Sequence, residues 1–157
     1  ELARFFATKS EEEAGHERWA LADLREIECR FGVAVARRPA ANIARLIAKL
    51  ERHIDENPVS YLGYMIFTEY FTVLLGPAWM RALTQHCGVP SSALSVVEHH
   101  VELDREHAAR GFRVLSDLSD HPGDELAVFE VVRGTMALLE AFYDELAALM
   151  QAPSHAA

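Results

Sequence analysis

Apolar residues recur every three or four positions along most of the chain, which is the spacing of helices that each bury one face. No stretch shows the sustained alternation of apolar and polar residues that is typical of a half-buried strand. Glycine and proline residues divide the pattern into segments, and short breaks between long helices favour antiparallel neighbours. We therefore expect an all-α antiparallel helical bundle, with helices over about 2–31, 40–56, 59–86, 91–118 and 124–150.

Local signals support two of these helix starts and one buried face. Ser91 or Ser92 follows Pro90 and is expected to cap the fourth helix. Asp124 and Glu125 place negative charge at the positive end of the fifth helix. The fifth helix also carries an apolar stripe that we predict to be ordinary core, formed by Phe129, Val132, Met136, Leu139, Tyr143, Leu146 and Met150.

Length, charge and cysteine content narrow the classes of function. The 157 residues are enough for one helical domain, predicted over 1–151, with a frayed tail over 152–157. The formal net charge of −9 disfavours binding to a phosphate backbone, so we expect no nucleic-acid partner. Cys29 and Cys87 are too few for a disulfide framework, and no secretion signal opens the chain. We expect a cytoplasmic protein with reduced thiols.

One segment has the length of a membrane span. The run from Val59 to Met80 contains a single charged residue, Glu69, together with two glycines and a proline. A carboxylate in lipid is costly, and the other segments are amphipathic. We therefore favour a buried core helix and expect no contact with a membrane.

Polar residues interrupt the core-facing stripe of the predicted helix over 91–118. His100, Asp104 and His107 follow one another at intervals of one turn, between small or apolar residues at both ends of the stripe. An unpaired buried carboxylate costs several kcal/mol, so this cluster must be compensated by a cation or by hydrogen bonds. The neighbouring polar residues fall on other faces and are expected to be solvated; they are Glu98, His99, Glu102, Arg105 and Glu106.

Two other predicted helices present polar groups in the same way. Glu69 interrupts the apolar face of its helix, and Glu13 and His16 form a Glu-x-x-His pair near the start of the chain. Three imidazoles and three carboxylates suit two first-row divalent ions with open positions for oxygen or substrate. A carboxylate-rich set favours iron, with manganese as the other metal that fits. The predicted ligands are Glu13, His16, Glu69, His100, Asp104 and His107.

Each part of this set has a simpler interpretation. Ser10 and Glu13 have the spacing of a capping box, which would make Glu13 a structural residue at a helix start. Glu69 alone could be a protonated core acid, and a His–Asp–His row could be a metal-free polar core. We favour the metal site because polar residues on three predicted inward faces occur together.

In this order the residues resemble the heme-oxygenase-like non-heme di-iron oxidases and oxygenases. The segment 12–24 is similar to the first ligand helix of that group, and Asn57-Pro58 followed by Glu69 resembles the second. The row His100-x-x-x-Asp104-x-x-His107 resembles its most distinctive motif. The resemblance implies that the six predicted ligands hold two Fe(II) ions, the second of them loosely. Thiaminase-like proteins, a cofactorless quinone-forming oxidase and heme oxygenases share the wider fold but lack this ligand set.

The resemblance also implies an enzyme that activates O2 to oxidise a small metabolite, such as an amino acid, a fatty acid or a nitrogen-containing compound. A homodimer is a further expectation. Proteins of this fold carry one or two helices before the Glu-x-x-His segment, so we expect those helices to be missing from this sequence. Two alternatives stay open. One is a cofactorless or heme-handling relative that uses His16 as base or axial ligand, and the other is a non-catalytic helical protein that binds a small ligand.

Several further residues have expected roles around such a centre. Asp23 is a candidate hydrogen-bond partner of a ligand. His86 and His99 are expected at the surface. The candidates for lining a substrate pocket, which could equally be plain core, are Trp19, Tyr61, Tyr64 and Phe67.

Overall fold

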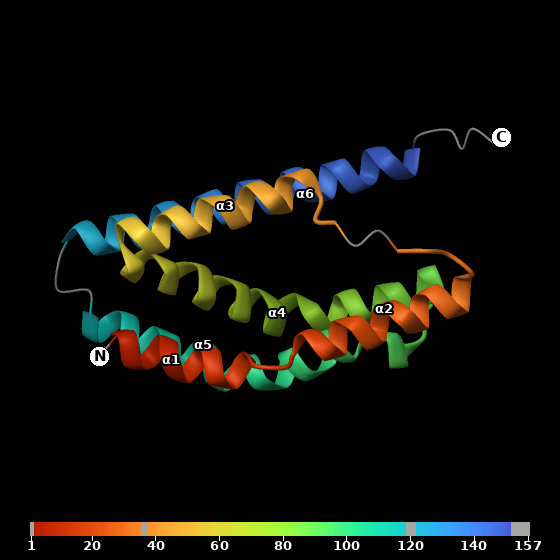
Figure 1. Cartoon of the computed structure of the whole chain (residues 1–157), viewed down its shortest axis with the longest axis horizontal. Helices are drawn as coiled ribbons and strands as arrows, with labels where there is room; N and C mark the ends of the chain where they lie inside the picture. The colour runs from red at the N-terminus through yellow and green to blue at the C-terminus, as the bar shows by residue number, and fades with distance from the viewer. Residues whose placement is uncertain (1, 36–37, 119–121, 152–157) are drawn as a thin grey trace. The chain divides into compact units, whose positions relative to one another are not determined.

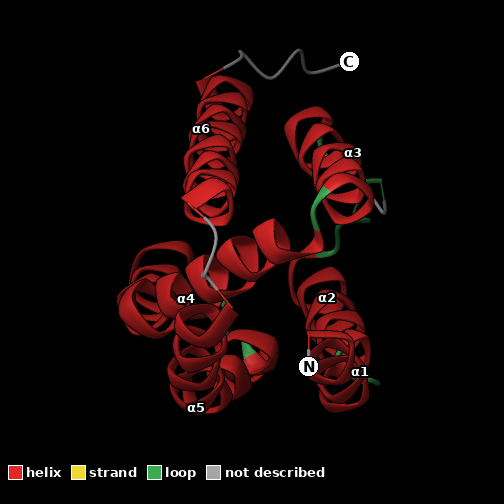
Figure 2. Ribbon diagram, turned by 90° about the vertical axis from the view of Figure 1, so that its left-hand side faces the viewer, coloured by secondary structure: helices red, strands yellow, loops and turns green. Residues whose placement is uncertain are grey.

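The computed structural model describes residues 2–35, 38–118 and 122–151, and all regular structure within these ranges is helical (Figures 1 and 2). The expected all-α class is therefore confirmed, and the tail predicted over 152–157 lies outside the described residues. In chain order the elements are α1 (Leu2–Glu13), α2 (Glu17–Phe31), α3 (Ala41–Glu56), α4 (Pro58–Cys87), the short 3-10 helix η1 (Ser91–Ala93), α5 (Ser95–Leu118) and α6 (Pro122–Gln151).

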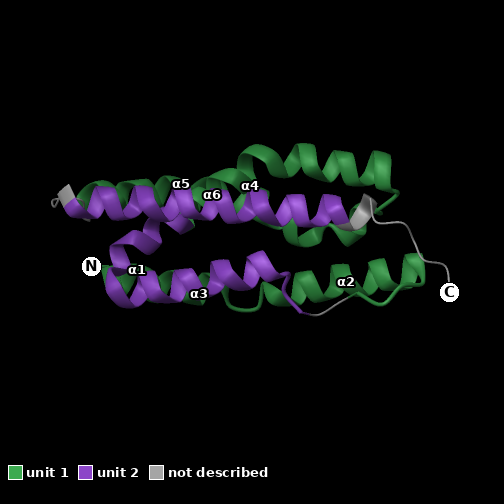
Figure 3. Cartoon of the chain, turned by 90° about the horizontal axis from the view of Figure 1, so that it is seen from above, with its two compact units in different colours: residues 1–36, 65–117 green, residues 37–64, 118–157 purple. Residues whose placement is uncertain are grey.

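The helices group into two compact units (Figure 3). Unit 1 contains Glu1–Ala36 and Met65–Asp117, and unit 2 contains Arg37–Tyr64 and Leu118–Ala157. The long helix α4 contributes residues to both. All six predicted ligands belong to unit 1, and a single domain over 1–151 stays a prediction.

In unit 2, α3 and α6 lie side by side and run antiparallel (Figure 1). The Asn42 amide near the start of α3 donates to the backbone oxygen of Ala141, late in α6. At the opposite end, the Asn57 amide donates to the Asp124 carboxylate at the start of α6. Between these two contacts the helices bury an apolar core centred on Leu46, Leu50 and Val131.

The face of α6 that enters this core differs from the predicted one. Val131 is buried while Phe129 is 62% exposed and Met136 is 54% exposed. Because α6 is apolar around much of its circumference, spacing alone did not select the side that α3 covers. Of the predicted stripe, Leu139 packs against the core, whereas the prediction was wrong for Phe129, Met136, Tyr143 and Leu146.

Unit 1 also consists of antiparallel neighbours. Side chains of α1 and α2 meet those of α5 in reverse order along the chain, from the Lys9–His107 contact to the Asp23–Ser95 contact. On α5, Gly111 allows a close approach to α4, because a Cβ at this position would lie 2.7 Å from Cγ1 of Ile66. Gly111 thus allows α4, which carries Glu69, to pack against α5, which carries His100 and His107.

The first predicted helix is interrupted in the structure. α1 ends at Glu13 and α2 begins at Glu17, and Gly15 in the connecting turn has a φ of +96°. Glycine adopts this backbone conformation without the steric cost that a Cβ would add. The capping-box interpretation was wrong, because Ser10 lies inside α1 and Glu13 is its last residue.

The start of α5 is also later than predicted. Ser91 and Ser92 lie in η1, and the regular helix begins at Ser95. The Asp23 carboxylate of α2 accepts hydrogen bonds from the Ser95 hydroxyl (2.6 Å) and the Val96 backbone N–H (2.9 Å). A buried carboxylate from another helix therefore satisfies the positive end of α5.

Two expectations from composition can be compared with the described residues. None of the helices within the described ranges has the length and apolar composition that a membrane crossing requires. Cys29 and Cys87 are free thiols, and both are exposed.

The turn between α1 and α2 makes a prediction about Gly15. Replacing Gly15 with Ala is expected to lower the free energy of unfolding by about 1–3 kcal/mol, because a Cβ is unfavourable at a φ of +96°. An added Cβ would meet nothing within 4 Å, so a clash would not be the cause. Chemical denaturation measures the effect. Gly123→Ala is the matched control, because this helical glycine also has open space around it, and it should not destabilise the protein.

Candidate metal centre

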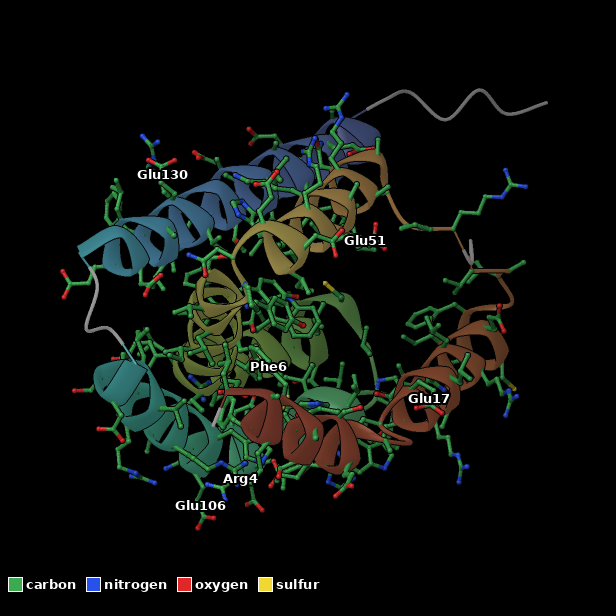
Figure 4. The ribbon with its side chains drawn as sticks, turned by 60° about the vertical axis from the view of Figure 1, so that its left-hand side comes forward. Arg4, Phe6, Glu17, Glu51, Glu106 and Glu130 are labelled. Carbon is green, nitrogen blue, oxygen red and sulfur yellow. The ribbon has the colours of Figure 1, made fainter. Side chains whose placement is uncertain are left out.

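Three segments of unit 1 bring the six predicted ligands into one region. Glu13 ends α1 and His16 directly precedes α2, while Glu69 lies in the middle of α4. The other three residues, His100, Asp104 and His107, follow one another along the inward face of α5. Glu69 and Asp104 are buried and the three histidines are partly buried. The neighbours predicted to be solvated are exposed, and Figure 4 shows one of them, Glu106, pointing away from the helices.

Glu13, His16 and His100 form the first group of donor atoms close enough to hold a metal ion. Nδ1 of His16 lies 2.8 Å from Oε2 of Glu13, although a turn rather than a continuous helix connects the two residues. Nε2 of His100 lies 3.6 Å from the same oxygen.

The orientation of His100 is fixed by the backbone of α5. Its Nδ1 lies 2.6 Å from the backbone oxygen of Val96 and must carry the proton, since a carbonyl oxygen only accepts hydrogen bonds. Nε2 therefore presents its lone pair toward Glu13 when the ring is neutral, which is the tautomer a metal-binding histidine needs. Asp23 was a candidate hydrogen-bond partner of a ligand, and in the structure its carboxylate accepts hydrogen bonds at the start of α5. One of these hydrogen bonds comes from the Val96 N–H, so Asp23 helps to position the first turn of α5, whose Val96 carbonyl orients the His100 ring.

Glu13, Glu69 and His107 form the second group of donor atoms. Glu13 belongs to both groups, so its carboxylate is the donor that the two groups share. Asp104 belongs to neither group, but its Oδ1 lies 3.6 Å from Nδ1 of His107. A ligand role for Asp104 stays a prediction.

Sequence reasoning missed Lys9, whose ammonium lies inside the second group. Nζ of Lys9 is 3.0 Å from Oε1 of Glu13, 2.7 Å from Oε1 of Glu69 and 2.8 Å from Nδ1 of His107. Lys9 is 5% exposed. The helical spacing contained the signal, because Phe6, Lys9 and Glu13 follow one another at intervals of three and four residues.

A second basic residue at the edge of the site was also missed. Arg110 of α5 forms two hydrogen bonds with the Glu12 carboxylate of α1. This pairing lowers the pKa of Glu12. Nε2 of His107 lies 3.6 Å from the same carboxylate, so the pair borders the second group.

Burial disfavours the charged forms of the carboxylates on α4 and α5. Desolvation raises the pKa of Asp104 to about 6, although the positive charges of His100 and Lys9 oppose the shift. Desolvation also raises the pKa of Glu69, against a hydrogen bond from Lys9. Burial alone would raise the pKa of Glu13 too, but hydrogen bonds from Lys9 and His16 outweigh it and the pKa is lowered. The region favours a cation over further negative charge.

The aromatic residues that were candidates for lining a substrate pocket lie in different parts of the structure. Trp19 stacks on His16 with ring centroids 4.2 Å apart and also contacts His99 and His100. Tyr61 and Tyr64 pack against the core of unit 2. Phe67 pairs with Phe71. Trp19 thus lies against two of the proposed ligands, and His86 and His99 are exposed as expected.

The chain matches no family model, and no curated protein or solved structure matches it significantly.

The raised pKa of Asp104 makes a prediction for the metal-free protein. As pH rises from about 4 to 6, the unfolded chain loses the Asp104 proton before the folded chain does, so this group lowers stability. Asp104→Asn removes that effect. The stability of the variant relative to the parent should therefore increase by on the order of 2 kcal/mol between pH 4 and pH 7. Denaturation at several pH values, in the presence of a chelator, measures the difference.

Glu106→Gln is the control for this experiment, because Glu106 is exposed on the same helix. Its stability relative to the parent should change little over the same pH range. A relative stability of Asp104→Asn that stays constant from pH 4 to pH 7 would contradict the raised pKa.

Proposed function

We propose that this chain binds two first-row divalent metal ions in unit 1 and uses them to activate dioxygen for the oxidation of a small metabolite. The proposal places it with the heme-oxygenase-like non-heme di-iron oxidases and oxygenases that its motifs resemble. The observation that carries it is the pair of three-residue donor groups that share Glu13. A carboxylate shared between two imidazole-containing groups is an arrangement that suits two neighbouring ions.

The chemistry of the donors supports iron or manganese. Both groups combine imidazole nitrogen with carboxylate oxygen, and the two cysteines are exposed and outside them. A structural zinc site would favour thiolates. Three carboxylates would offset most of the charge of two dications, so ions could be held in a partly buried region. Bound Fe(II) would supply the electrons that reduce dioxygen.

The residues around the donors have separate roles in this proposal. Glu13 would bridge the two positions, and the Val96 carbonyl would keep Nε2 of His100 available. Trp19 would cover one face of His16 and restrict solvent there. The substrate class is carried by the family resemblance alone and comprises amino acids, fatty acids and nitrogen-containing metabolites.

Iron content tests the proposal. After anaerobic loading with excess Fe(II), the parent is expected to hold two irons per chain and to consume O2 when air is admitted. Glu13→Gln should lose most of both ions, because Glu13 belongs to both donor groups. His107→Ala should lose only the ion of the Glu13–Glu69–His107 group. Metal analysis and an oxygen electrode provide the measurements.

A double variant, His100→Ala with His107→Ala, removes one donor from each group. Its matched control is His53→Ala with His86→Ala, which changes two histidines outside the groups. Equal iron content in the parent and the His100/His107 double variant would show that the ligand assignment is wrong. An intense Soret band after heme addition would favour the heme-handling alternative, and neither iron nor heme binding would favour the small-ligand-binding protein.

A further inference from the structure

Lys9 is a buried cation whose hydrogen-bonding capacity is fully used. An ammonium group has three N–H donors, and Nζ of Lys9 has three acceptors at 2.7–3.0 Å. Lysine is almost never buried without such partners. Because the acceptors come from α1, α4 and α5, the ammonium joins three helices of unit 1.

The three acceptors of Lys9 are also the complete second donor group. Glu13, Glu69 and His107 offer it the same kinds of atom that they would offer a metal ion. Metal ions bind such donors at about 2.0–2.2 Å, so an ion would take the space that the ammonium occupies. Two positive charges at this distance would also repel each other strongly in a partly buried site. The ion and the ammonium therefore exclude each other.

The first donor group does not contain this obstacle. Lys9 contacts Glu13 through Oε1, whereas His16 and His100 face Oε2 of the same carboxylate. An ion between His16, His100 and Oε2 of Glu13 can therefore enter while Lys9 stays in place.

We propose that Lys9 is the resident cation of the Glu13–Glu69–His107 group, and that a divalent ion enters this group only by displacing the lysine. The inference rests on the proposed metal centre and adds an order of loading to it. The Glu13–His16–His100 group fills first, and the second group fills by exchange of one cation for another. In the metal-free protein, Lys9 takes the place of the ion in holding α1, α4 and α5 together.

Lys9→Met separates the two roles of the lysine because it should change stability and metal affinity in opposite directions. Without the ammonium, the metal-free variant should unfold at a lower denaturant concentration than the parent. The variant should bind its second Zn²⁺ at least tenfold more tightly than the parent does. Its affinity for the first Zn²⁺ should change less than threefold. Calorimetric titration of metal-free protein with Zn²⁺ alone measures both steps. Lys49→Met is the matched control, since Lys49 belongs to unit 2, and it should titrate like the parent.

A second measurement uses the unaltered chain and so does not depend on the folding of a variant. Lys9 and Lys49 are the only lysines in the sequence, so ¹⁵N-lysine labelling gives two side-chain ammonium signals to assign. Three hydrogen bonds and burial should slow proton exchange and make the Lys9 signal visible in the metal-free protein. The signal should persist through the first equivalent of Zn²⁺ and disappear with the second.

The outcomes distinguish this inference from the proposed function. If the parent binds no Zn²⁺ and no Fe(II), the metal centre itself is wrong. If the parent binds two ions but Lys9→Met leaves the second affinity unchanged, the metal centre stands and the role of Lys9 is wrong. Loss of the Lys9 signal at the first equivalent of Zn²⁺ would overturn the proposed order of loading. Persistence of the signal after two equivalents would overturn the displacement of Lys9 by the second ion.

Discussion

Glu13, Glu69 and Asp104 bring three carboxylates from three helices into one partly buried region of unit 1, where negative charge needs a cation. Lys9 meets part of that need through three short contacts. Within the described residues no cation lies at a comparable distance from Asp104, and burial raises its pKa to about 6. The same electrostatic demand that makes unit 1 costly to assemble makes it suited to hold divalent ions.

Local features of the helices in unit 1 hold the donor side chains close to one another. Gly15 ends α1 directly after Glu13 and lets His16 fold back to within 2.8 Å of it. Asp23 fixes the first turn of α5, and the Val96 carbonyl in that turn fixes His100. Residues outside the donor groups thus determine where the donor atoms point, which is how a protein prepares a site before an ion arrives.

The two donor groups are unequal, although the sequence presents their residues as one symmetrical set of three imidazoles and three carboxylates. The group with His16 and His100 has an oriented imidazole and no lysine, whereas the group with Glu69 and His107 encloses an ammonium. The chemistry proposed for this chain requires both positions. If Lys9 is displaced as proposed, it would link the stability of the metal-free protein to the binding of the second ion.

The sequence by itself determined the helical class, most helix boundaries and the inward position of Glu69, His100, Asp104 and His107, because periodicity reports directly which residues share a helix face. It did not determine the break at Gly15, since a glycine after alanine does not by itself end a helix. It did not select the buried face of α6, because α6 is apolar on several sides and only the packing of α3 decides among them. The place of Lys9 among donors from three helices depended on contacts between residues up to 98 positions apart. Such contacts exist only once the helices have packed, and for that reason the tertiary structure alone decided which cation the site contains.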